Sequence, residues 1–141
     1  MFAFDSDALV YATQAGNPLG DLVAELFEVD AEITPIVGIG SVVLIPETLI
    51  YPTRHGAVSE VTRLLSFYRR LDLIPVSEPI ASRAVALGAK YGLKAMDAIH
   101  LATAITTGAS AFLTNNKKDF PRTITEITIK YPSDLATERI S

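Results

Sequence analysis

The chain has 141 residues, 49% of them hydrophobic, and a net charge of −4. This length suits one domain with a sizeable core, and the hydrophobic content excludes a disordered chain. Cysteine is absent, which excludes disulfides and thiolate metal sites and favours a reducing compartment, so we expect a cytoplasmic protein without a signal peptide.

Strand-like and helix-like segments alternate along the chain, which predicts an α/β fold with a largely parallel sheet. Ser77 is a good N-cap and Gly92 a good helix end, while Pro52 should end or kink a helix. Arg69 and Arg70 are expected at the surface. In chain order we expect a strand at 2–4, a helix from about 8, a helix at 18–30, a strand at 36–45, a short helix opening at 46–47, a helix marked by apolar residues from 58 to 71, a strand at 73–76, helices at 77–92 and 95–107, and strands at 109–114 and 127–131.

One uncharged segment is long enough to be a membrane span. No formally charged residue lies between Asp97 and Lys117, and that length is sufficient to cross a bilayer. The segment contains His100, Gly108 and several Thr, Ser and Asn residues. A soluble helix, a turn and a strand is therefore the better interpretation, and we expect no membrane contact.

Acidic residues follow the ends of several predicted strands. Asp5 comes after the first strand, Glu47 after the second, and Asp119 a few residues after the strand at 109–114. Asp97 lies in the first turn of a helix, where the helix dipole favours an ionised carboxylate. Because ligands of open parallel sheets bind beyond the carboxyl ends of the strands, these acids should converge at one edge.

A carboxylate cluster of this kind has a specific chemistry. Its members repel one another, so the cluster should hold protons or a cation. Mg²⁺ prefers oxygen ligands, and a bound metal activates water and stabilises the charge of a phosphodiester. With no cysteine and only two histidines, a zinc site is not expected. The basic surface typical of nucleic-acid binding is absent, but a metal would supply the positive charge instead.

The same residues also have structural interpretations. His100 shares a helix face with Asp97, and a core-facing or hydrogen-bonding role is favoured for it over a ligand role. Each acid could likewise serve the fold alone: as a helix cap for Asp5 or Asp7, a helix-terminal charge for Asp97, a solvated first-turn acid for Glu47 and a loop residue for Asp119.

Four segments carry a resemblance to a known family. They are "FDSDALVYA", "VLIPETL", "LKAMDAIHLATA" and "FLTNNKKDF". In order and spacing they resemble the acidic motifs of the PIN domain, and most closely those of the VapC-type toxins of bacterial and archaeal toxin–antitoxin pairs. The resemblance covers most of the chain. It implies a single PIN-like domain over residues 1–141, α/β in class, with a central mostly parallel sheet flanked by helices.

The resemblance also implies a function. This is a Mg²⁺- or Mn²⁺-dependent endoribonuclease, a hydrolase acting on RNA, whose partners are a small antitoxin and a second copy of the chain in a homodimer. Asp5 and Asp97 would be the main metal ligands. Glu47 would bind the metal or orient an attacking water, and Asp119 would bind it directly or through water.

The sequence departs from the family pattern at two positions. Asp7 stands where a neutral polar residue is usual, and we favour a helix cap for it over an additional ligand. Pro46 directly before the second acid is less usual. Family members also differ between an acid at the position of Asn116 and one at Asp119. In this chain Asn116 and Ser6 would fix the site by hydrogen bonds.

The sequence leaves two further functions open. The first is a non-catalytic PIN-like binding module with an impaired metal site. The second is a phospho-acceptor receiver domain, which needs a lysine at the end of a late strand; Lys130 lies mid-strand and fits poorly. Lys117, Lys118 and Arg122 beside the fourth motif are either a solvated face or contacts to RNA phosphates.

Overall fold

The computed structural model describes residues 1–140, so Ser141, the last residue of the expected domain, lies outside the described residues. Five strands form one sheet in the order β3-β2-β1-β4-β5, and every neighbouring pair is parallel. The predicted α/β fold is confirmed. The elements are β1 (Phe2–Phe4), α1 (Ser6–Ala12), α2 (Pro18–Glu25), β2 (Gly38–Ser41), α3 (Leu44–Arg54), α4 (Val58–Tyr68), β3 (Leu71–Ile74), α5 (Glu78–Tyr91), α6 (Ala95–Thr106), β4 (Ala111–Leu113), β5 (Ile129–Lys130) and α7 (Pro132–Ile140).

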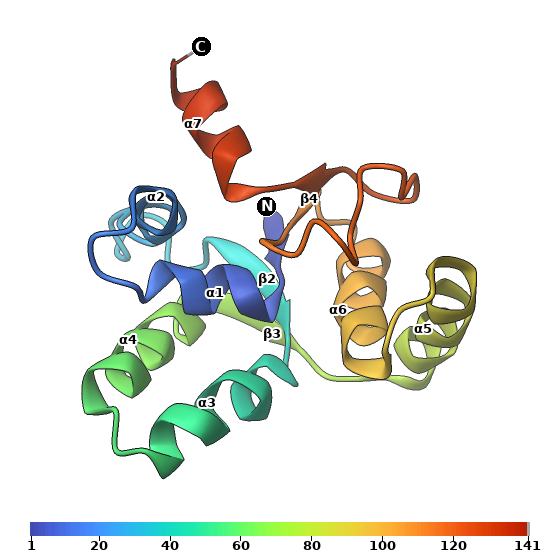
Figure 1. Ribbon diagram of the computed structural model, residues 1–141, viewed down its shortest axis with the longest axis horizontal. Coiled ribbons are helices and arrows are strands. Elements are labelled where there is room, and N and C mark those ends of the chain that lie inside the picture. The colour runs from blue at the N-terminus through green and yellow to red at the C-terminus, as the bar shows by residue number, and fades with distance from the viewer. Residues whose placement is uncertain (141) are drawn as a thin grey trace.

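Helices cover both faces of the sheet. Figure 1 shows α1, α2, α3 and α4 on one side and α5 and α6 on the other. Because successive side chains of a strand point to opposite faces, Phe4 and Leu113 pack into the first layer, while Ala3 and Phe112 pack into the second. Burial on both faces explains why the central strands are apolar and uncharged.

The predicted helix caps agree with the structure better than the predicted strand ends. Ser77 accepts a hydrogen bond from the N–H of Ile80, and Gly92 ends α5 with φ of 66°. The strand expected at 36–45 is limited to Gly38–Ser41, because α3 begins at Leu44. Pro46 fits the first turn of α3, where its missing N–H has no intrahelical partner to lose.

Other boundaries also differ from the prediction. β3 begins at Leu71 rather than residue 73, since that leucine extends the apolar stripe of α4 but is buried in the sheet. α2 ends at Glu25, well before residue 30. The closing helix α7 was not predicted, because its sequence is largely polar, and Leu135 packs it against the core.

One arginine anchors the irregular segment between α2 and β2. Arg70 was expected at the surface but is only partly exposed, because its guanidinium donates to backbone carbonyls at 2.6–2.8 Å. Such carbonyls, outside helices and strands, need donors when they are shielded from water. The acceptors are the carbonyl oxygens of Phe27, Val29, Thr34 and Pro35.

The anchor gives a testable prediction. Arg70→Met keeps the length of the side chain but removes all the donors, so it should lower the free energy of unfolding by about 2–4 kcal/mol. Urea unfolding followed by circular dichroism measures the change. Arg69→Met is the control, because its guanidinium is not a donor to this segment. Equal stability of the two variants would contradict the anchoring role.

Candidate metal-binding active site

Asp5 is a carboxylate buried at the carboxyl end of β1. Its residue is 2% exposed, and its oxygens accept hydrogen bonds from the Ser6 N–H at 2.9 Å and the Thr114 hydroxyl at 2.8 Å. Burial, followed by the negative charge of Asp7, raises the pKa of Asp5 well above its usual value, although the Thr114 and Ser6 hydrogen bonds oppose the shift. Asp5 is also the N-cap of α1. The same residue therefore caps this helix and supplies a carboxylate at the end of β1.

Asp7 is not the helix cap that the sequence favoured. It lies in the first turn of α1, and its Oδ1 accepts hydrogen bonds from the Asn115 N–H at 2.9 Å and the Thr114 hydroxyl at 3.3 Å. The reason is the parallel pairing of β1 with β4, which brings the loop after β4 beside the start of α1. Asp7 therefore joins the two segments and adds charge beside Asp5.

The charges of several neighbouring acids raise the pKa of Asp97. It lies in the first turn of α6 and is partly exposed. Burial raises its pKa first, and the charges of Asp119, Glu47 and Asp7 raise it further, while His100 opposes the shift. These acids come from α1, α3 and the loop after β4. The charges of Asp119 and Glu47, two of the acids expected to converge, thus reach Asp97 together with the charge of Asp7.

Glu47 faces the same region from the first turn of α3. Its Oε2 lies 3.2 Å from Nε2 of His100, and its side chain is 23% exposed. Burial alone would raise the pKa of Glu47, but hydrogen bonding to His100 and Ser6 outweighs burial and lowers it. The expected hydrogen-bonding role of His100 is confirmed, and Ser6 contributes as expected.

Asp119 is held in the loop after β4. Asn116 donates from Nδ2 to Oδ2 of Asp119 at 2.8 Å and accepts from the Asp119 N–H at 3.1 Å. The next residue, Phe120, is fully buried, and its carbonyl accepts from the Tyr131 hydroxyl at 2.7 Å. Asn116 thus orients the acid, as expected, and Phe120 anchors the loop that carries both.

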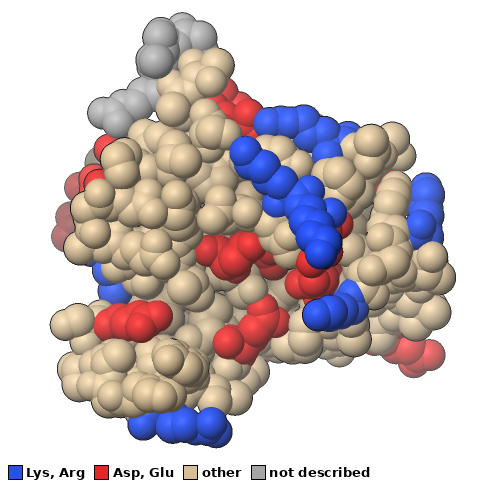
Figure 2. Space-filling model, viewed as in Figure 1, with Lys and Arg blue, Asp and Glu red and all other residues tan. Residues whose placement is uncertain are grey.

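Together these acids form the acidic site, defined here by Asp5, Asp7, Glu47, Asp97 and Asp119. Figure 2 shows acidic side chains near the middle of the face where the ends of α1, α3 and α6 meet in Figure 1. Basic side chains lie along one side of them. The arrangement combines negative charge, partial burial and access from solvent.

The donor set fits a hard divalent cation, although no three acidic or histidine side chains within residues 1–140 already form a metal-holding group. Several of the carboxylates accept hydrogen bonds from protein donors. Mg²⁺ keeps most of its waters and needs only one or two carboxylates. The raised pKa of Asp97 shows that added positive charge would be favoured there. Asp5, Asp97, Glu47 and Asp119 are the oxygen donors that would hold it.

The basic residues beside the fourth motif are Arg122, Lys117 and Lys118. Arg122 makes structural contacts: it donates to both carboxylate oxygens of Asp134 at 2.7 and 2.8 Å, and it lies over the Tyr131 ring. Lys117 also lies over that ring, and Lys118 is exposed. Lys130 pairs with Glu138, which does not support the receiver-domain alternative.

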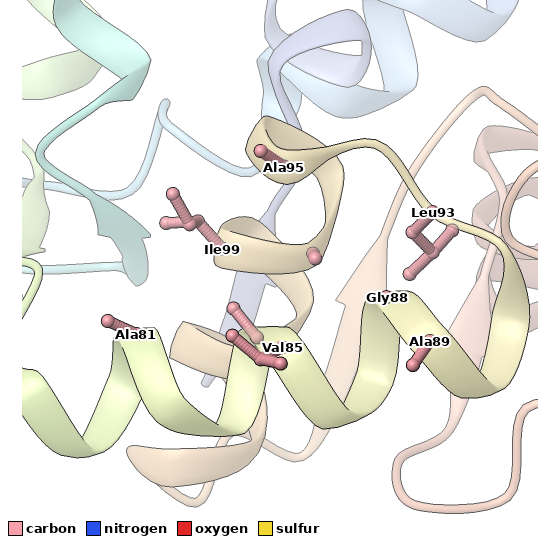
Figure 3. A pocket seen from close by; sticks show the side chains of 9 residues that line it. Ala81, Val85, Gly88, Ala89, Leu93, Ala95 and Ile99 are labelled. Carbon is pink, nitrogen blue, oxygen red and sulfur yellow. The ribbon is translucent and has the colours of Figure 1, made fainter.

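A separate apolar hollow lies between α5 and α6 and has a volume of about 380 Å³. Figure 3 shows its lining of small and aliphatic side chains, including Ala81, Val85 and Ile99. No titratable group lines it, so it cannot perform acid–base or metal chemistry.

Within residues 1–140, no helix combines the length and apolar character needed to cross a membrane.

Thr114 is a residue that the sequence places at this end of the sheet but to which it assigned no role. It is fully buried, donates to Asp5 and Asp7, and accepts from the Asn116 N–H at 3.0 Å. Its position at the end of an apolar strand, directly before two asparagines, was the available signal. A hydroxyl at the end of a buried strand needs partners, and the strand-end acids are the nearest ones.

The comparisons with known proteins agree with this geometry. A sequence model described as "PIN domain" matches residues 2–124, so the chain belongs to the PIN domain family, whose members are generally nucleases. No curated protein matches the chain.

Solved structures share the fold. The chain is similar to a toxin–antitoxin complex from Klebsiella pneumoniae, with 26% identity, a TM-score of 0.68, and coverage of 92% of this chain and 95% of that chain. It is also similar to VapBC2 from Rickettsia felis bound to a DNA fragment from its promoter, with 18% identity, a TM-score of 0.67, and coverage of 92% and 97%. At that lower identity, the second likeness shows the fold alone.

The raised pKa of Asp97 predicts how stability depends on pH without metal. A raised pKa means that the folded state holds the proton more tightly, so stability is lost as the pH rises from 3.8 through the raised value. At neutral pH in EDTA, Asp97→Asn should be as stable as wild type or more stable, by less than about 1 kcal/mol because water screens this site. The gain should vanish at pH 3.8 and below.

The control is Asp21→Asn, which alters an exposed acid in the first turn of α2. If Asp97 were only a helix-terminal charge, both variants would lose about 0.3–1 kcal/mol at neutral pH. Urea unfolding at several pH values separates the two cases. A loss of stability in Asp97→Asn equal to that in Asp21→Asn would refute a repelling cluster.

Proposed function

We propose that this chain is a Mg²⁺- or Mn²⁺-dependent endoribonuclease that hydrolyses RNA phosphodiester bonds at the acidic site, and that residues 1–141 form one PIN domain. The observation that carries the proposal is the placement of Asp7, Glu47 and Asp119, which come from separate segments, near enough to Asp97 for their charges to raise its pKa. Such perturbed groups in an accessible position are typical of functional sites. The nuclease activity general in the family supports the same conclusion.

The residues have distinct roles in the proposed reaction. A bound divalent cation supplies charge neutralisation and an activated water. Asp5 and Asp97 would provide the anionic oxygens that hold the cation. Glu47, with its lowered pKa, is ionised at neutral pH and orients the attacking water. Asp119, which Asn116 fixes by a hydrogen bond, would hold the cation directly or through water.

We further propose a toxin role. The Klebsiella pneumoniae structure that this chain resembles is a toxin–antitoxin complex. On that basis the chain acts in the cytoplasm as a homodimeric toxin, and a small antitoxin protein inhibits it. The antitoxin would cover the acidic site, and a cationic side chain is the chemistry that would pair with its carboxylates.

The alternative is a non-catalytic PIN-like binding module. It is favoured by one observation, the absence within residues 1–140 of a ready-made group of three metal-holding side chains. It predicts that RNA binds but remains intact with either metal. A cleavage assay distinguishes the two.

RNA cleavage is the direct prediction. Purified wild-type protein should cleave structured or unstructured RNA with Mg²⁺ or Mn²⁺ and not with EDTA. Asp97→Asn should lower the rate by roughly 100-fold or more, because it removes a hard anionic ligand at the centre of the site. Asp21→Asn, a matched acid outside the site, should cleave at the wild-type rate. Equal cleavage by both variants would show that the activity belongs to a contaminant or to another site.

Inhibition by a partner is a separate prediction. When the native operon is expressed, a small protein should co-purify with this chain, because a toxin needs its inhibitor from the moment of synthesis. Adding that protein in excess should suppress RNA cleavage without changing the RNA itself. Full cleavage in the saturated complex would count against the toxin role but not against the nuclease.

A further inference from the structure

The His100 side chain combines complete burial with a single polar contact among the described residues. Its side chain is 0% exposed, and Nε2 lies 3.2 Å from Oε2 of Glu47. The other ring nitrogen, Nδ1, is buried and has no hydrogen-bond partner among the described residues. His100 lies on α6 and Glu47 on α3, and these helices lie on opposite sides of the sheet in Figure 1.

This contact assigns the hydrogen on the ring. A carboxylate oxygen only accepts, so Nε2 carries the proton and donates it to Glu47. Nδ1 is then unpaired in either state of the ring, as a bare lone pair or as an N–H without acceptor. A buried polar atom without a partner costs stability. Packing alone does not explain a histidine here, because an aliphatic side chain of similar volume would avoid that cost.

We propose that His100 is a positioning residue, whose Nε2–H fixes the orientation of the Glu47 carboxylate across the gap between α6 and α3. The proposal rests on the proposed function for the importance of Glu47, but not for the contact itself. The same helix carries Asp97 one turn earlier, so α6 sets the position of one acid directly and of another through His100. Hydrogen bonding by His100 also offsets the effect of burial on Glu47.

The ring itself can be tested in the metal-free protein. Nitrogen-15 NMR at a pH where imidazoles are neutral should show His100 as the Nε2–H tautomer. His55 is an internal reference, since its Nδ1 lies 2.9 Å from the Tyr51 carbonyl and should carry the proton. In Glu47→Gln the tautomer preference of His100 should weaken and that of His55 should not. An Nδ1–H tautomer of His100 in wild type would overturn the proposal, whether or not the chain cleaves RNA.

Variants then separate positioning from packing. His100→Leu has a similar volume and no donor, so its melting temperature in EDTA should not fall, while RNA cleavage should fall roughly 10- to 100-fold. His100→Gln places an amide donor near the position of Nε2 and should restore most of the activity. Thr103→Val, which removes a buried hydroxyl one turn along α6, is the control and should leave cleavage unchanged.

A double-mutant cycle gives the final distinction. In the Glu47→Gln background, His100→Leu should cause little further loss of cleavage, because the group that it positions is already altered. An equal loss in both backgrounds, wild-type activity of His100→Leu, or failure of that variant to fold would each overturn the proposal. If wild type cleaves no RNA, the proposed function fails, and the NMR measurement still decides the role of His100.

Discussion

Mutual repulsion among carboxylates is the constraint around which this end of the molecule is organised. Parallel pairing directs the carboxyl ends of β1, β2 and β4 to one edge of the sheet, so the acids that follow them come close together. Each must then be offset by a donor. Thr114 serves Asp5 and Asp7, while His100 serves Glu47. The remaining imbalance lies in the raised pKa values of both Asp5 and Asp97.

The donors are themselves held by the fold. Thr114 ends a strand buried on both faces, and His100 lies on the buried side of α6. Thr48, on the same helix as Glu47, hydrogen-bonds the Tyr68 hydroxyl, which ties α3 to α4. Burial of that hydroxyl raises the pKa of Tyr68 to about 12, so the tie stays intact over the ordinary pH range. Buried side chains of helices on both sides of the sheet therefore support the acidic site.

The C-terminal part of the chain supports the site from outside the segment that matches the PIN family model, which ends at residue 124. Tyr131 holds the carbonyl of Phe120, directly after Asp119, and its ring lies beneath Lys117 and Arg122. Arg122 in turn binds Asp134 at the start of α7. The last strand and helix therefore fix the loop that supplies the fourth acid, although neither carries a carboxylate of the site.

The sequence by itself determined the α/β class, the alternation of elements and the caps at Ser77 and Gly92, and it predicts which acids form the site. These depend on local signals: apolar periodicity, cap chemistry and motif spacing. Only the tertiary structure decided that Asp7 bonds to the loop after β4 rather than capping a helix, and that Arg70 anchors a distant segment. It also decided that Nε2 of His100 meets Glu47, while Nδ1 has no hydrogen-bond partner in the part of the chain that the structure describes. Those partners lie tens of residues away, and chain folding alone determines which of many distant donors and acceptors meet.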